Sequence, residues 1–160
     1  MAIPAAQVLE QLLAVLREAF EGPADPRWSY FTTNAPATGL FGTLEGVDAA
    51  LASRPVGGTS VAAHVHHETF ALEATAAWIR GDRSRRDWSQ SWRVQQVDAA
   101  GWDALQQALR RGYEELREAV RAHGLDGEES AGGALAGVAH AAYHLGAIRQ
   151  KLAVLRREHP

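Results

Sequence analysis

Histidines are the residues of this chain whose spacing points most directly to chemistry. Five of the seven fall in two short segments, one containing His64, His66 and His67 and the other His140 and His144. Residues four apart lie on one face of a helix, about 6 Å apart along its axis, so His140 and His144 can both reach one ion. The chain has no cysteine, so a metal must be held by His, Asp or Glu side chains. Two helices that bring these segments together would form a candidate metal site.

The first segment must supply the third ligand, and helical geometry narrows the choice. Successive residues lie about 100° apart around a helix axis, so His64 and His67 are about 60° apart, whereas His66 points elsewhere. Geometry therefore favours His67 or His64 over His66 without choosing between them. An i, i+4 histidine pair alone is more often two partly exposed side chains, so the second cluster is what indicates a metal.

These two segments resemble the motifs of the DinB/YfiT-like metalloenzyme superfamily. The matching runs are Thr59-Ser-Val-Ala-Ala-His-Val-His-His67-Glu68 and His140-x-x-x-His144-x-Gly146. In that family one histidine on the second bundle helix and an H-x-x-x-H-x-G motif on the last helix bind one divalent metal. Seven residues usually separate the serine that opens the helix from its ligand, and counting from Ser60 gives His67. The resemblance therefore implies His67, His140 and His144 as ligands.

Two further features bear on this resemblance. A branch of the family carries a second histidine three residues before the ligand, which matches His64. That residue would be either a fourth ligand or the hydrogen-bond partner of a metal-bound water. The family often has a glutamine directly after the glycine of the last motif, whereas this chain has Ala147. The role of that glutamine is then absent here unless Gln150 substitutes for it.

Three histidine ligands leave coordination positions open, and open sites bind water or substrate, whereas structural zinc sites are normally closed by four protein ligands. We expect one divalent ion, zinc or nickel, with manganese or iron as alternatives. The resemblance implies a metal-dependent enzyme, a transferase or isomerase that uses a low-molecular-weight thiol, or a hydrolase-like activity. The alternatives are a binding or interaction module whose metal only ties two helices together, and a metal-free, pH-sensitive histidine cluster. No residue is assigned as catalytic.

Other residues are candidates for the surroundings of the metal or for substrate contacts, namely His64, Glu68, Tyr143, Asn34, Trp88 and Trp92. Most have a simpler interpretation. Glu68 would be a solvated carboxylate and Tyr143 a packing residue, and for the two tryptophans we favour a cap on the end of the bundle. The arginines at 83, 85 and 86 could hold an anionic thiol cofactor, although a solvated loop is the more common outcome.

Four long helices are predicted to position these residues. Apolar residues at three- and four-residue spacing mark helices over 4–20, 61–80, 99–122 and 131–157, and a shorter one over 40–52 despite Gly42 and Gly46. Thr59 or Ser60 would cap the second long helix, and Asp98 the third. No strand alternation is present. The expected fold class is therefore all-α, a four-helix bundle with one extra short helix, as a single domain over residues 1–160.

Composition argues against several classes of protein. The chain is 46% hydrophobic and 22% charged, as in a globular domain. A net charge of -3, with no basic block beyond residues 80–86, argues against nucleic acid as a partner. The first twenty residues lack the basic start and apolar run of a signal peptide, and no later segment suits a membrane, so we expect a cytoplasmic location. A small-molecule substrate or thiol is the expected partner, and the apolar helix surface would also allow a homodimer.

Overall fold

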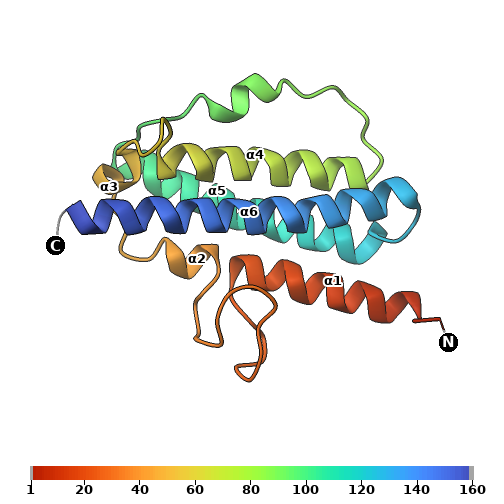
Figure 1. Ribbon diagram of the computed structural model, residues 1–160. Helices are drawn as coiled ribbons and strands as arrows, with labels where there is room; N and C mark the ends of the chain where they lie inside the picture. Colours follow the sequence, from red (N-terminus) through yellow and green to blue (C-terminus); the bar gives the residue numbers. More distant parts are fainter. Residues whose placement is uncertain (1, 159–160) are drawn as a thin grey trace.

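The computed structural model describes residues 2–158, which fold into helices joined by loops (Figure 1). In chain order the elements are α1 (Ala5–Phe20), α2 (Leu40–Thr43), α3 (Ala49–Ser53), α4 (Val61–Ile79), the 3-10 helix η1 (Trp88–Trp92), α5 (Ala99–His123) and α6 (Glu128–Glu158). Among the described residues no strand forms, apart from an isolated antiparallel bridge between Val56 and Thr59. The predicted all-α class is confirmed. No helix in this range is both long and apolar enough to cross a bilayer.

Helix α4 lies at the centre of the packing. It runs beside α5 and α6, and η1 covers part of its remaining surface, while α1 packs against α5 and α6 (Figure 1). A helix surrounded in this way buries side chains on most of its faces, so α4 shows no clear polar stripe. The apolar core between the long helices includes Leu16, Phe20, Leu72, Leu116, Leu145 and Ile148.

Side-chain caps determine where the two central helices begin. The Ser60 hydroxyl accepts the N–H of Ala63 at 3.0 Å and donates to the carbonyl of Gln95 at 2.6 Å. One hydroxyl therefore starts α4 and also ties it to the connection that follows η1. Asp98 caps α5 by accepting a backbone N–H of the first turn at 2.8 Å. Both caps were predicted, and Ser60 rather than Thr59 takes the first position.

Two predicted helices differ from the structure. The single helix expected over 40–52 is wrong, because a turn in which Gly46 has a φ of 70° separates α2 from α3. Glycine adopts this left-handed conformation at little cost, and the helix cannot continue through it. Asp48 then starts α3 by accepting the N–H of Leu51 at 2.7 Å. Helix α6 begins at Glu128 rather than near residue 131, with two carboxylates in its first turn, where the helix dipole favours them.

A buried carboxylate organises the loop that follows α1. Glu18 is 2% exposed. Its oxygens accept hydrogen bonds from the N–H groups of Tyr30, Phe31 and Thr32 and from the hydroxyls of Ser29 and Thr32. Burial raises the pKa of Glu18, but the donors together outweigh it and lower the pKa to about 2. The ionised carboxylate thus holds residues 29–32 against α1.

Candidate metal centre

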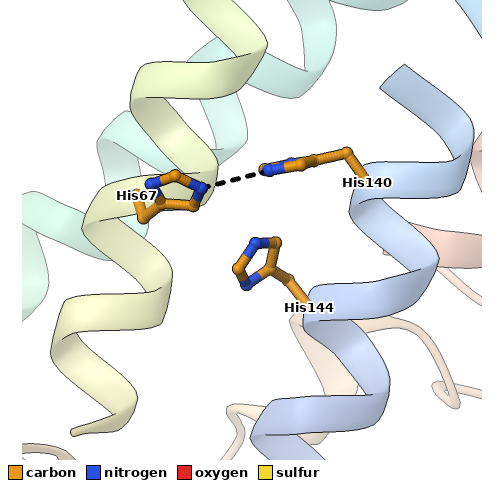
Figure 2. Close-up of side chains that lie close together, drawn as sticks. All are labelled: His67, His140 and His144. Carbon is orange, nitrogen blue, oxygen red and sulfur yellow. Dashed lines mark hydrogen bonds between the residues drawn. The ribbon is translucent and has the colours of Figure 1, made fainter. Parts of the chain in front are cut away.

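Three histidines come together between α4 and α6 (Figure 2). His67 lies on α4, and His140 and His144 lie one turn apart on α6. One ring nitrogen from each lies within 4.8 Å of the corresponding nitrogens of the other two. The ring centroids are 4.4, 4.9 and 5.0 Å apart. His67 and His144 are buried and His140 is partly exposed. The structure thus brings together the three residues that the family resemblance implied.

A glycine on α6 lets this helix approach α4 closely. Gly137 is buried, and a Cβ atom at that position would lie 3.2 Å from the Leu116 side chain and 3.3 Å from that of Thr75. Gly146, in contrast, faces open space. The approach of the two helices therefore depends on the glycine one turn before His140, and not on the glycine of the H-x-x-x-H-x-G motif.

The rings of His67 and His140 face each other through their Nε2 atoms. These two atoms are 3.1 Å apart (Figure 2). Two nitrogens bound to one tetrahedral zinc ion, each about 2.0–2.1 Å from the metal, would be separated by about 3.3 Å. The spacing of this pair is therefore already close to that of two ligands sharing an ion.

The other nitrogen of each of these two rings has a partner that determines where the ring proton lies. His67 Nδ1 is 2.8 Å from Ser91 Oγ, and this hydroxyl donates its own proton to the carbonyl of Trp88 at 2.7 Å. Ser91 must therefore accept the proton of His67 Nδ1. His140 Nδ1 is 2.8 Å from Glu68 Oε2, a carboxylate oxygen that accepts. Both Nε2 atoms consequently carry lone pairs.

Two lone pairs directed at each other across 3.1 Å repel unless a cation lies between them. Glu68 adds to the negative potential, because its second oxygen, Oε1, is buried with no hydrogen-bond partner among residues 2–158. Burial raises the pKa of Glu68, and the hydrogen bond from His140 opposes that rise. Acceptors that face one another beside a buried carboxylate provide an environment for a positive charge. Imidazole donors suit zinc, copper, iron and nickel, so the residues fit a transition-metal ion.

Burial keeps the imidazoles of His64, His67 and His144 neutral. It lowers the pKa of His64 and His67 to about 4 and that of His144 to about 3, and neighbouring positive groups lower these values further. Those groups are other histidines and, for His64, the ammonium of Lys151. An imidazole must be neutral to bind a metal, so the shifted pKa values favour coordination at neutral pH.

His64 lies behind the cluster rather than in it. Its Nδ1 is 2.9 Å from Nδ1 of His144, and its Nε2 is 3.1 Å from the hydroxyl of Thr59. When His144 donates its Nδ1 proton to His64, its Nε2 keeps a lone pair, and Figure 2 shows this nitrogen directed toward the other two rings. Both nitrogens of His64 are engaged. His64 is therefore placed next to a candidate ligand, in contact with His144. Its predicted roles as a fourth ligand or as the partner of a metal-bound water stay predictions.

The 3-10 helix η1 covers the cluster along the side of α4. Trp92 stacks on His67, with ring centroids 4.1 Å apart and planes inclined by 16°, and meets His64 edge-on at 5.2 Å. The ring of Trp88 lies 6.1 Å from that of His67. The prediction that these tryptophans cap the end of the bundle is therefore wrong. Between them lies Ser91, which no sequence signal identified as the partner of a ligand.

Two other sequence candidates contact the cluster. Glu68 is 1% exposed, so its interpretation as a solvated carboxylate is wrong. Tyr143, expected to be a packing residue, is 69% exposed and meets His144 edge-on at 5.0 Å. Asn34 is exposed and lies in the loop between α1 and α2, and it is not among the residues that the structure brings together at the cluster.

The remaining histidines lie outside the cluster. His66 Nδ1 donates to the carbonyl of Ser91 at 2.7 Å, which agrees with the geometric argument that its ring points elsewhere. His123 Nδ1 lies 2.8 Å from an Asp126 carboxylate oxygen at the end of α5. His159 is outside the described residues.

Two cavities border η1, one at Trp88 and Ser89 and the other at Trp92. One, of about 490 Å³, is bordered by His64, Trp92, Tyr143, Gln150 and Lys151. Gln150, considered as a substitute for the family glutamine, therefore lies on the His64 side. The other cavity, of about 1050 Å³, is bordered by Trp88 and by the arginines at 83, 85 and 86. Space for small molecules thus exists next to the helix that covers the cluster.

Comparisons of the chain with models of protein families, with curated proteins and with solved structures found no match. The resemblance to the DinB/YfiT-like superfamily therefore rests on the order of the helices and, for its specific motifs, on the two histidine segments. The case for a metal rests on the geometry of His67, His140 and His144 and of the groups that contact them.

Proposed function

We propose that this protein is a DinB-like four-helix-bundle metalloprotein that holds one divalent ion through the Nε2 atoms of His67, His140 and His144. The observation that carries the proposal is the pair of Nε2 atoms that face each other at 3.1 Å, while each ring has a hydrogen-bond partner at Nδ1. Zinc or nickel suits the imidazole donors, with manganese or iron as alternatives.

The residues around the ligands would hold them in place. Ser91, Glu68 and His64 each contact the Nδ1 atom of one ligand. Partners of this kind set the tautomer of a ligand histidine and increase its basicity. The carboxylate of Glu68 would also offset part of the charge of the ion. Trp92 excludes water from one face of the His67 ring.

We propose further that the ion serves a metal-dependent reaction of a small molecule. Three protein ligands leave at least one position free, and a divalent ion lowers the pKa of a water or thiol bound there. The engagement of both His64 nitrogens supports an open position, because it leaves no fourth histidine for the ion. The family resemblance implies a thiol-dependent transferase or isomerase.

Metal content tests the site. Protein stripped with a chelator and re-equilibrated with zinc should contain close to one equivalent by elemental analysis. His67→Ala, His140→Ala and His144→Ala should lose stoichiometric binding, whereas His123→Ala, which removes a histidine at the end of α5, should keep it. Wild-type protein that takes up neither zinc, nickel nor manganese would refute the proposal.

Cobalt substitution tests whether the position is open. The visible spectrum of the cobalt-loaded protein should change when a small thiol or azide is added, because an exogenous ligand changes the coordination of the ion. An unchanged spectrum with one equivalent of cobalt bound would instead favour an ion that only ties α4 to α6.

A further inference from the structure

The residues that line the larger cavity, of about 1050 Å³, indicate which kind of ligand it binds. It lies between the second half of α4, the connection 82–89 and the first turns of α6. Its volume is in the range of small-molecule sites. The three candidate ligand histidines and the groups that contact their Nδ1 atoms do not line this cavity. One wall residue, Trp88, also contacts His67.

The walls of this cavity are small aliphatic residues and exposed indole rings. Ala74, Gly133 and Ala136 line it, and a Cβ atom on Gly133 would lie 3.1 Å from Trp78, so the glycine lets α6 approach this ring. Trp78 is 40% exposed and Trp88 is 49% exposed. Exposed indoles beside a hollow offer a flat apolar ligand a surface that it can cover.

Trp78 is held in position before a ligand arrives. Its Nε1–H donates to the carbonyl of Glu129 at 3.3 Å. The Arg83 guanidinium lies 3.9 Å from the centroid of its ring and also contacts the Glu129 carboxylate at 2.5 Å. Because these contacts limit the movement of the indole, little side-chain entropy is lost when a ligand packs against it.

One of the charged side chains that line the cavity, an arginine, forms no ion pair among the described residues. Three arginines and two aspartates line it, a net charge of +1. Arg83 is paired with Glu129, and Arg86 is paired with Asp82 at 3.1 Å. The Asp87 carboxylate accepts hydrogen bonds from the first residues of η1. Arg85 has no hydrogen-bond or ion-pair partner in the chain from 2 to 158.

We propose that this cavity binds a small monoanion with a flat apolar body, such as an aryl carboxylate, with its carboxylate on Arg85 and its ring against Trp78 and Trp88. An arginine fork matches the two oxygens of a carboxylate. The binding does not depend on a metal in the histidine cluster. If the cluster does hold an ion, Trp88 would lie between the ligand and His67.

The test compares two probes of the same shape and different charge. Binding of 2-naphthoate and of neutral 2-naphthamide is measured by calorimetry on metal-free protein, so that coordination to an ion cannot contribute. We expect 2-naphthoate to bind about three- to tenfold more tightly, as for a charge-assisted contact partly screened by water. Arg85→Gln should abolish this preference while leaving 2-naphthamide unaffected. Arg111→Gln, which removes an exposed arginine on α5, is the matched control and should keep it.

A second variant tests the location. Ala136→Leu fills part of the cavity and should weaken both probes, without changing the zinc content of the protein. Equal affinity for the two probes, a preference that survives in Arg85→Gln, or no binding of either probe at millimolar concentration would overturn the inference. Each of these results leaves the metal proposal standing if zinc uptake is normal. Failure of zinc uptake leaves the cavity inference standing if the charge preference is observed.

Discussion

Replacing Glu68 with glutamine should separate the affinity of the site for metal from the stability of the fold. Glu68 is 1% exposed, its Oε2 accepts the His140 Nδ1 proton at 2.8 Å, and its Oε1 has no partner in the described chain. Glutamine has nearly the same shape, and its carbonyl can accept the same proton. The substitution therefore removes the negative charge and changes little else around His140.

The expected loss of metal affinity is large. Mutation of a residue that hydrogen-bonds a ligand histidine typically costs 10- to 100-fold in metal affinity, or about 1.4–2.7 kcal/mol. Here the cause is the loss of the carboxylate charge, which would offset part of the charge of the ion. In the metal-free protein two effects oppose each other. Removing a buried charge with an unpartnered oxygen stabilises the fold, and the unpartnered amide group that replaces it costs about 1–3 kcal/mol. We therefore expect the free energy of unfolding of the metal-free variant to stay within about 1 kcal/mol of wild type.

Zinc affinity is measured by competition with a chromophoric chelator, and stability by urea unfolding with and without zinc. Glu73→Gln is the matched control, because Glu73 is exposed on the same helix. It should have wild-type zinc affinity. The reasoning would be refuted if Glu68→Gln bound zinc as tightly as the control, or if the metal-free variant lost several kcal/mol of stability.

Three further outcomes are expected. Ser91→Ala should weaken zinc binding by about 10- to 100-fold because His67 loses its Nδ1 partner, and Ser89→Ala, in the same 3-10 helix, should not; the chelator competition decides. The pKa of Glu18 is lowered from 4.5 to about 2. The ionised carboxylate therefore stabilises the folded state fully above pH 4.5, and this stabilisation is lost as the pH falls through 2. Glu18→Gln should therefore lower the free energy of unfolding by about 3 kcal/mol at pH 7, and this deficit should shrink toward pH 2 in denaturant titrations. Gly42→Ala should lower the thermal midpoint without changing zinc content, because a Cβ there would overlap a carbonyl oxygen of the preceding loop.

The pair on α6 could be predicted from the sequence because the spacing of His140 and His144 is a local property of a helix. The choice between His64 and His67 is of another kind. It depends on the rotation of α4 about its own axis, which is set by packing against α5 and α6 and by the hydrogen bonds of Ser60. Helical periodicity carries no information about that rotation, and only the family resemblance pointed to His67.

The groups that orient the ligands could not be predicted. Ser91 lies 24 positions from His67, in a connection without periodicity, and Glu68 contacts a histidine 72 positions away rather than its neighbour in the chain. The break between α2 and α3 was missed because helices of four and five residues are too short to show an apolar repeat. What the sequence did predict correctly, the four long helices and the caps at Ser60 and Asp98, follows from patterns within one element.

Two contacts between α4 and α6 bear on the register in which these helices pack. Adjacent residues of α4, His67 and Glu68, both reach His140, one at Nε2 and the other at Nδ1. A helix advances 1.5 Å per residue, so sliding α4 by a single residue would break both contacts at once. Aliphatic side chains tolerate such a slide far better, because their attraction has no preferred direction. The polar cluster therefore fixes the register of two helices whose apolar surfaces could pair in several ways. Before an ion is bound the hydrogen bond between Glu68 and His140 does so alone, and an ion between the two Nε2 atoms would add the second contact.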